Sequence, residues 1–213
     1  MSRDDAGEGP VSFSRRDFLK GAGAAAIATS ALQAGPGASP ALAQPVRDQG
    51  FEVRGPQAVS IELKVNGNVH KVAVEPRATL LDTLRNQLDV TGPKKICDRG
   101  ACSGCVVLLN EQPVCSCLTL AIDCEGAAIT TVEGLAHGDE LHPVQAAFVE
   151  HDALQCGFCT PGMVMSVTAL LKRKPDATLD DVKHAVAGNI CRCGTYPKVF
   201  EAALAAGKKM QGR

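Results

Sequence analysis

Eight of the ten cysteines in this chain fall into two groups of four, and this grouping restricts the fold more than any other feature of the sequence. The first group lies in the middle of the chain and the second near its end. The members are Cys97, Cys102, Cys105 and Cys117 in the first group, and Cys156, Cys159, Cys191 and Cys193 in the second. Neighbours this close in sequence are poorly placed to join distant segments by disulfides. We therefore expect each group to converge on a common centre.

The spacing within each group is informative. In the first group, three cysteines share one glycine-containing loop and the fourth follows after eleven intervening residues. This is the C-x4-C-x2-C…C spacing of plant-type [2Fe-2S] ferredoxins, in which three ligands on a tight loop are joined by a fourth from the next element. The second group pairs a C-x-x-C at Cys156 and Cys159 with a C-x-C at Cys191 and Cys193, so two separate segments must meet in space.

Spacing alone leaves other uses of the cysteines open. Tetrahedral thiolate ligation suits zinc as well as iron, so two zinc sites are an alternative. Disulfides are a second alternative in an exported protein, although a disulfide scaffold usually spreads its cysteines along the chain. The C-x4-C-x2-C spacing is unusual for a zinc ribbon and favours iron. The two cysteines outside the groups, Cys115 and Cys124, are expected to be buried thiols, with a disulfide between them after export as the alternative.

The residues around both groups resemble a known family. The stretches are Cys97-Asp-Arg-Gly-Ala-Cys-Ser-Gly-Cys105-Val, Cys117-Leu-Thr-Leu-Ala, Gln155-Cys-Gly-Phe-Cys-Thr-Pro-Gly-Met and Gly188-Asn-Ile-Cys-Arg-Cys193-Gly-Thr-Tyr. In this order they resemble the iron–sulfur subunit of the xanthine dehydrogenase and aldehyde oxidoreductase family, the molybdenum hydroxylases. The resemblance covers about residues 58–206, and periplasmic aldehyde oxidoreductase is the type that the chain resembles most. One departure is that the family usually has C-G-x-C where this chain has Cys102-Ser103-Gly104-Cys105. If position 103 needs a positive φ, serine carries a steric cost that glycine avoids.

The resemblance implies an electron-transfer subunit with two [2Fe-2S] clusters, held by the eight grouped cysteines. It implies a large partner subunit with a molybdenum-pterin cofactor, which oxidises an aldehyde or an N-heterocycle, and then an FAD subunit or a cytochrome-type acceptor. By the same resemblance the cluster of the second group lies nearest molybdenum and the first passes electrons outward. Gln155 and Cys193 match the residues that approach the pterin. The alternatives are a stand-alone two-cluster carrier and a zinc-stabilised binding module.

Hydrophobic periodicity predicts an α+β fold with a β-grasp ferredoxin domain first. Alternation over 59–65 and 68–74 around Asn66-Gly67 predicts a β-hairpin. Thr79 is a predicted N-cap before a helix over 80–88, whose leucines share one face. After the cysteine loop, strands are expected at 106–109, 113–114 and 128–132.

The second half of the chain has the pattern of a small four-helix bundle. Helices are expected over 144–149, from Thr160-Pro161 to 173 with Thr160 as N-cap, from a Thr178 cap to about 187, and over 199–208. The predicted domain organisation is a signal peptide at 1–43, a linker or arm at 44–57, the β-grasp domain at 58–135 and the helical domain at 136–213.

The first residues have the pattern of a twin-arginine signal peptide. Ser14-Arg-Arg-Asp-Phe-Leu-Lys20 precedes a mild apolar run and a small-residue cleavage site at Ala41-Leu-Ala43. This route exports folded proteins, so clusters inserted before export are compatible with a periplasmic location. A basic amphipathic helix that stays attached is the alternative.

Composition narrows the class of protein further. A formal net charge of -1 gives no electrostatic footprint for nucleic acid, and no stretch reaches the roughly 18 apolar residues of a membrane span. The sequence also has no G-x-G-x-x-G fingerprint, phosphate loop or motif-supported catalytic triad. We therefore expect no catalytic residues in this chain and chemistry in a partner.

Overall fold

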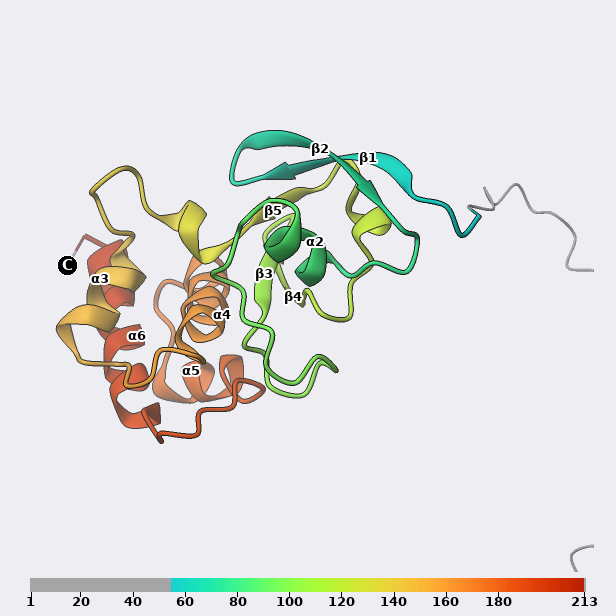
Figure 1. The fold of residues 1–213 in the computed structure, drawn as a ribbon. Helices are drawn as coiled ribbons and strands as arrows, with labels where there is room; N and C mark the ends of the chain where they lie inside the picture. Colours follow the sequence, from blue (N-terminus) through green and yellow to red (C-terminus); the bar gives the residue numbers. More distant parts are fainter. Residues whose placement is uncertain (1–54, 213) are drawn as a thin grey trace, which may run out of the picture. The chain divides into compact units, whose positions relative to one another are not determined.

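The structure is a computed structural model that describes residues 55–212 (Figure 1). The predicted signal peptide at 1–43 and most of the predicted linker at 44–57 lie outside the described residues. The described part runs from a strand hairpin through one helix and three further strands into a helical segment. The predicted α+β class is confirmed.

The described part of the chain contains one mixed sheet. Its strands are β1 (Val59–Val65), β2 (Asn68–Val74), β3 (Val106–Leu109), β4 (Gln112–Cys115) and β5 (Ala128–Thr130). They lie in the order β2-β1-β5-β3-β4, and β1 and β5 are parallel while the other neighbours are antiparallel. The predicted hairpin is confirmed, with Ile61 and Leu63 buried between exposed neighbours. Its turn uses Asn66 at φ +49° and Gly67 at φ +85°, the two positive angles that a type I′ turn requires.

Helix α2 (Leu80–Asn86) covers the sheet. Leu80 and Leu84 share a buried core with Ile61 and Leu63 of β1. As predicted, Thr79 caps the helix, because its hydroxyl accepts the backbone N–H of Asp82 at 3.1 Å. This packing fixes one end of the long loop that carries the first cysteine group.

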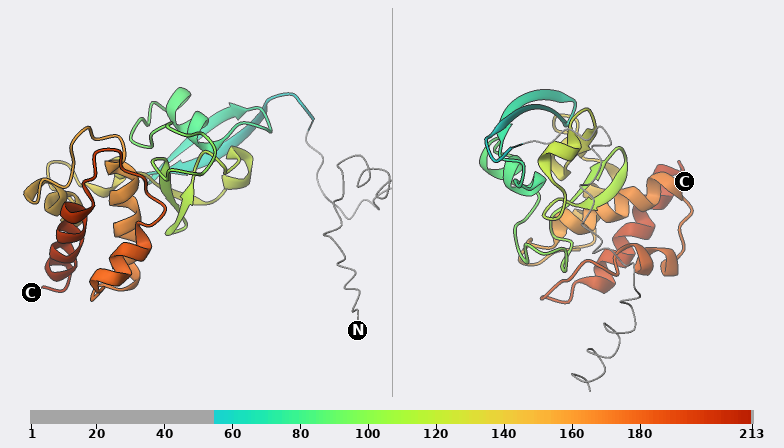
Figure 2. Two further views of the ribbon diagram at one scale, coloured as in Figure 1. Left: turned by 90° about the horizontal axis from the view of Figure 1, so that it is seen from below. Right: turned by 90° about the vertical axis from the view of Figure 1, so that its right-hand side faces the viewer.

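Four helices follow the sheet and lie together in both views of Figure 2. They are α3 (Pro143–Glu150), α4 (Thr160–Arg173), α5 (Leu179–Ala185) and α6 (Tyr196–Met210). Their buried core contains Phe148, Met163 and Leu171, and it also contains Val106 and Leu108 from β3. The helices therefore pack directly on β3, the strand that follows Cys105. The predicted division between 135 and 136 stays a prediction.

Four local predictions were wrong. Helix α2 ends at Asn86 instead of 88, and Gln87 is its C-cap. Thr160 is the first helical residue of α4 rather than its N-cap; the cap position is Cys159, whose side chain makes no capping bond. Helix α6 begins at Tyr196 instead of 199, since Pro197 is tolerated in the first turn of a helix. Strand β5 ends at Thr130, because a 3₁₀ turn at Val132–Leu135 ends the extended backbone.

Thr178 caps α5 in the predicted capping box. Its hydroxyl accepts the Asp181 N–H, and the Asp181 carboxylate accepts both the N–H and the hydroxyl of Thr178 at 2.7 Å. The Lys174 amine and the Thr178 bonds hold the pKa of Asp181 well below its usual range, so this box is intact at neutral pH.

We expect Thr178→Ala to lower the free energy of unfolding by about 1 kcal/mol, because one helix-end N–H loses its acceptor. Urea unfolding at pH 7 measures the change. Thr178→Ser keeps the hydroxyl and should behave nearly as the native chain; an equal loss in both variants would contradict the capping role.

Candidate metal centres

The first cysteine group is assembled by the loop between α2 and β3 together with the end of β4. Cys105 directly precedes β3, and Cys117 lies just beyond Cys115, the last residue of β4. Pairing of β3 with β4 holds these ends together, and the Ser116 hydroxyl donates to the Cys105 carbonyl at 2.7 Å. The sheet thus brings the fourth cysteine to the loop that carries the other three.

Left-handed backbone angles turn the loop around its cysteines. Asp98, Gly100 and Ser103 have φ values of +55°, +71° and +53°. Position 103 therefore does adopt a positive φ, with the steric cost that serine carries there. The turn at Gly100 directs its N–H toward Cys117, where it donates to the sulfur at 3.2 Å. Such N–H···S bonds are a usual feature of iron–sulfur sites.

Sulfurs of the first group lie close enough to affect one another's ionisation. Cys97 interacts with Cys102, and Cys117 interacts with Cys105. The backbone N–H of Arg99 lowers the pKa of Cys97 to about 7, while burial raises the pKa of Cys117 to about 12. A metal would have to displace protons here, as thiolate ligation always requires.

The second cysteine group is built at the starts of two helices. Cys159 occupies the cap position of α4, and Cys191 lies five residues before Tyr196, the first residue of α6. The Tyr196 hydroxyl accepts the Cys191 N–H at 2.9 Å, and the Thr195 hydroxyl lies 3.2 Å from the Cys191 sulfur. Helix starts present free N–H groups and a partial positive charge, which suit anionic sulfur.

The sulfurs of the second group also affect one another: Cys159 interacts with Cys191 and Cys156, and Cys193 interacts with Cys156 and Cys191. Burial raises the pKa of Cys159 to about 12. For Cys191, burial opposes ionisation, but the hydroxyl and N–H of Thr195 outweigh it and lower the pKa to about 7. Cys97 in the first group and Cys191 in the second therefore both have a pKa lowered to about 7.

The number of thiols bears on which metal fits. A [2Fe-2S] cluster takes four cysteine ligands, and each group supplies four. The donor set in each group therefore fits the two-iron cluster.

The two cysteine groups contact each other through Ser103. Its carbonyl accepts the Asn189 side-chain amide at 3.2 Å, and the neighbouring Cys102 carbonyl accepts the Ile190 N–H at 3.1 Å. Gly162 of α4 packs on the same Ser103 carbonyl, with no room for a side chain. We call Cys102, Ser103, Gly162, Asn189 and Ile190 the junction. It connects Cys102 of the first group with Ile190, the neighbour of Cys191.

Comparison with known proteins identifies the family. A family model described as a [2Fe-2S] binding domain matches residues 131–204. The chain is 41% identical over 207 residues to the aldehyde oxidoreductase iron-sulfur-binding subunit PaoA of Escherichia coli K12, covering 90% of this chain and 87% of that protein. This chain belongs to the iron–sulfur subunits of the molybdenum hydroxylases. It is therefore a subunit of an oxidoreductase.

Other relatives of this iron–sulfur subunit agree. The nicotine 6-hydroxylase small subunit of Paenarthrobacter nicotinovorans is 48% identical, over 70% of this chain and 89% of that protein. Among solved structures, quinoline 2-oxidoreductase from Pseudomonas putida 86 has a chain that is 40% identical with a TM-score of 0.69, covering 73% of this chain and 98% of that one.

A model of the twin-arginine translocation signal sequence matches residues 12–31, which indicates export by that route to the periplasm. This segment lies outside the described residues. In the part of the subunit that the structure describes, no helix is both long and apolar enough to span a bilayer.

The residues expected to approach a pterin lie at the exposed side of the second group. Gln155 is exposed and directly precedes Cys156, and the sulfur of Cys156 contacts exposed Cys193. The structure therefore brings Gln155 and Cys193 to the same edge of this group.

The sequence alone did not indicate the roles of Thr195 and Tyr196 beside Cys191.

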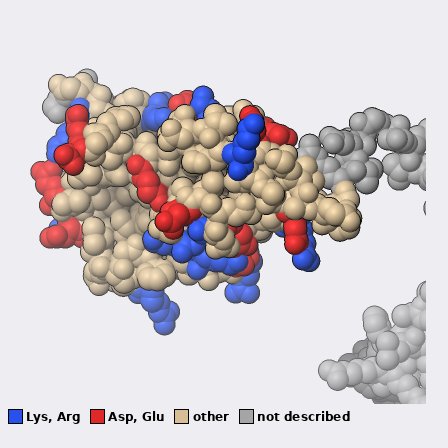
Figure 3. Space-filling model, turned by 45° about the horizontal axis from the view of Figure 1, so that its top comes forward, with Lys and Arg blue, Asp and Glu red and all other residues tan. Residues whose placement is uncertain are grey.

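Apolar side chains border this exposed edge. Leu154, Phe158 and Ile190 are 41%, 59% and 56% exposed. Leu154 also lines a hollow of about 330 Å³, most of whose other lining residues come from α3 and the start of α4. On the face drawn in Figure 3, charged side chains of both signs are interspersed among larger uncharged areas.

The two remaining cysteines are free thiols, so they form no disulfide with each other. Cys124 is fully buried, donates to the Leu120 carbonyl at 3.4 Å, and has a pKa raised by burial to about 11. Cys115 is half-buried instead, and it lies against the first cysteine group.

Proposed function

We propose that this subunit relays electrons through two [2Fe-2S] clusters, one on each cysteine group. The electrons would come from a molybdenum-pterin partner that oxidises an aldehyde or an N-heterocycle, and would leave to an FAD subunit or a cytochrome-type acceptor. The observation that carries the proposal is the gathering of four cysteines in each group, together with the junction between the groups.

A [2Fe-2S] cluster accepts and releases one electron at a time. The residues around each group support that exchange by stabilising negative charge on sulfur. Gly100 does so at Cys117, and Thr195 does so at Cys191. These bonds favour the more negative reduced form and so raise the potential.

The junction supports transfer between the groups. A single hydrogen bond joins the Cys102 carbonyl to the Ile190 N–H, and Ile190 is covalently linked to Cys191. Electrons could therefore pass from one ligand set to the other through covalent bonds and this one hydrogen bond, with no intervening solvent.

The exposed edge of the second group supports a direction for the relay. Gln155 and Cys193 would face the pterin there, and the apolar residues Leu154, Phe158 and Ile190 would be covered by the molybdenum subunit. The first group would then pass electrons outward. This arrangement corresponds to a β-grasp ferredoxin domain at 58–135 and a four-helix-bundle domain at 136–213, with a mature chain that begins near residue 44.

Metal analysis tests the cofactor assignment. We expect about four iron and four acid-labile sulfides per mature chain, and two distinguishable [2Fe-2S] EPR signals after dithionite reduction. Zinc without labile sulfide would overturn the proposal in favour of a structural-metal module.

A charge on the exposed apolar edge tests the partner assignment. We expect Phe158→Asp to reduce the molybdenum that co-purifies with the tagged subunit from its native host by about tenfold or more, since a desolvated carboxylate opposes docking. Both clusters should persist.

Val69→Asp is the matched control, because Val69 is similarly exposed (63%) but lies on β2. It should leave the molybdenum content unchanged. A stand-alone carrier would instead purify with its clusters and without molybdenum in all three proteins.

A further inference from the structure

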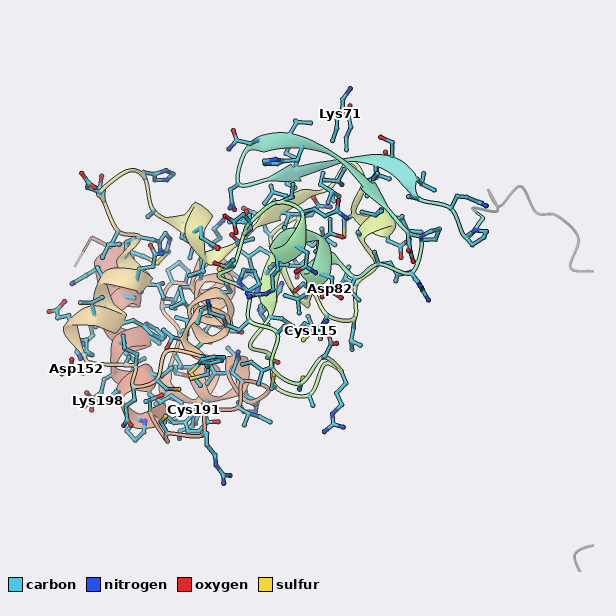
Figure 4. All side chains as sticks on the ribbon, in the orientation of Figure 1. Lys71, Asp82, Cys115, Asp152, Cys191 and Lys198 are labelled. Carbon is cyan, nitrogen blue, oxygen red and sulfur yellow. The ribbon has the colours of Figure 1, made fainter. Side chains whose placement is uncertain are left out.

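Cys115 lies beside the first cysteine group without belonging to it. As the last residue of β4, it is paired in register with Val106 of β3, the residue that follows Cys105. Its side chain packs against Cys105, Cys117 and Leu81. Figure 4 labels it among the side chains next to the cysteine loop. Strand pairing therefore holds this thiol at a fixed place against the ligand sulfurs.

Two polar neighbours orient the Cys115 thiol. Its sulfur lies 3.9 Å from the Ser103 hydroxyl, and its side chain packs against Cys105. Ser103 is itself fixed, because its carbonyl accepts the Asn189 amide and packs on Gly162. A neutral thiol can donate one hydrogen bond and accept another. The geometry therefore allows a chain from hydroxyl to thiol to ligand sulfur.

We propose that Ser103 and Cys115 are positioning residues that raise the reduction potential of the first cluster, with Ser103 donating to Cys115 and Cys115 donating to the Cys105 sulfur. This inference rests on the proposed function, since it requires a cluster on the first group. On reduction the cluster gains one electron, while the hydroxyl proton of Ser103 and the thiol proton of Cys115 stay on their own residues.

The physical basis is the difference in charge between the two redox states. The reduced cluster is more negative, so a donor at a ligand sulfur stabilises it more than the oxidised cluster. The hydroxyl donor strengthens the thiol donor by polarising it. The same bond gives a use for serine at φ +53°, where glycine would avoid the steric cost.

An EPR-monitored redox titration of the two-cluster protein tests this. For Cys115→Ala we expect the equilibrium constant for reduction of the first cluster to fall about three- to tenfold, which is about 28 to 59 mV for a one-electron couple. The potential of the second cluster should not change. Cys115→Ser keeps a donor and should recover most of the shift.

Two further variants separate the proposal from structural damage. Ser103→Gly leaves every cysteine in place and relieves the backbone, and we expect it to lower the first potential by a smaller factor. Cys124→Ala removes a buried thiol away from both groups, and we expect no change in either potential.

An unchanged first potential in Ser103→Gly and Cys115→Ala, with both clusters loaded, would overturn this inference alone. If Cys115→Ala loses its first cluster, Ser103→Gly decides the matter, and an unshifted potential there overturns the inference. Absence of a first-cluster signal in the native protein would instead overturn the proposed function.

Discussion

Replacing Cys191 by serine is expected to remove one of the two clusters and leave the other intact. Iron and labile sulfide should each fall from about four to about two per chain, because an alcohol is a much poorer ligand than a thiolate for these clusters. The EPR signal of the first cluster should persist. The fold should survive, because serine is nearly isosteric and the Cys191 N–H still reaches the Tyr196 hydroxyl.

The matched control for this change is Cys124→Ser. Cys124 lies in the sheet core outside both cysteine groups, so this variant should keep about four irons. Loss of both clusters from a folded Cys191→Ser protein would show that the two sites do not assemble independently. The junction would then be more than a route for electrons, since one site would depend on the other.

The sheet and the cysteine groups could be predicted from the sequence because their causes are local. The hairpin follows from period-two burial in β1 and from Asn66-Gly67, which tolerate the positive φ angles of the turn. The eight-cysteine grouping follows from spacing alone. The alternation and the spacing are each contained within a few dozen residues.

The contact between the groups could not be predicted in this way. Nothing in the spacing shows that Ser103 meets Asn189, since 86 residues separate them and the contact depends on how α4 packs on β3. The one available sign was a serine in place of the glycine usual in the family. Likewise Gly162 looked like an ordinary residue of a helix start, and only its packing shows why a side chain cannot be present there.

Of all the glycine-to-alanine substitutions in the described part of the chain, Gly162→Ala is expected to be the most disruptive. The added Cβ would overlap the Ser103 carbonyl and the Gly104 backbone, which cannot rotate away as a side chain can. Overpacking of this kind typically costs about 1–3 kcal/mol, and relief would require α4 to move away from the cysteine loop. Alanine is favoured over glycine in a helix by about 1 kcal/mol, which offsets part of this cost. With the overpacking cost at the upper end of its range, we expect the free energy of unfolding to fall by a net of about 2 kcal/mol.

Gly188→Ala is the control variant. It tests whether the loss of stability comes from the contact with the Ser103 carbonyl or whether any added methyl group near the junction is destabilising. Its Cβ would meet only the Ser103 hydroxyl, at 3.2 Å, and no backbone atom. We expect its free energy of unfolding to stay within about 0.5 kcal/mol of the native value, as for most mild substitutions. Because only Gly162→Ala should also lengthen the Ile190–Cys102 bond, only that variant should slow electron transfer between the clusters. Equal losses in both variants would mean that the Ser103 carbonyl is not the fixed contact between the two cysteine groups.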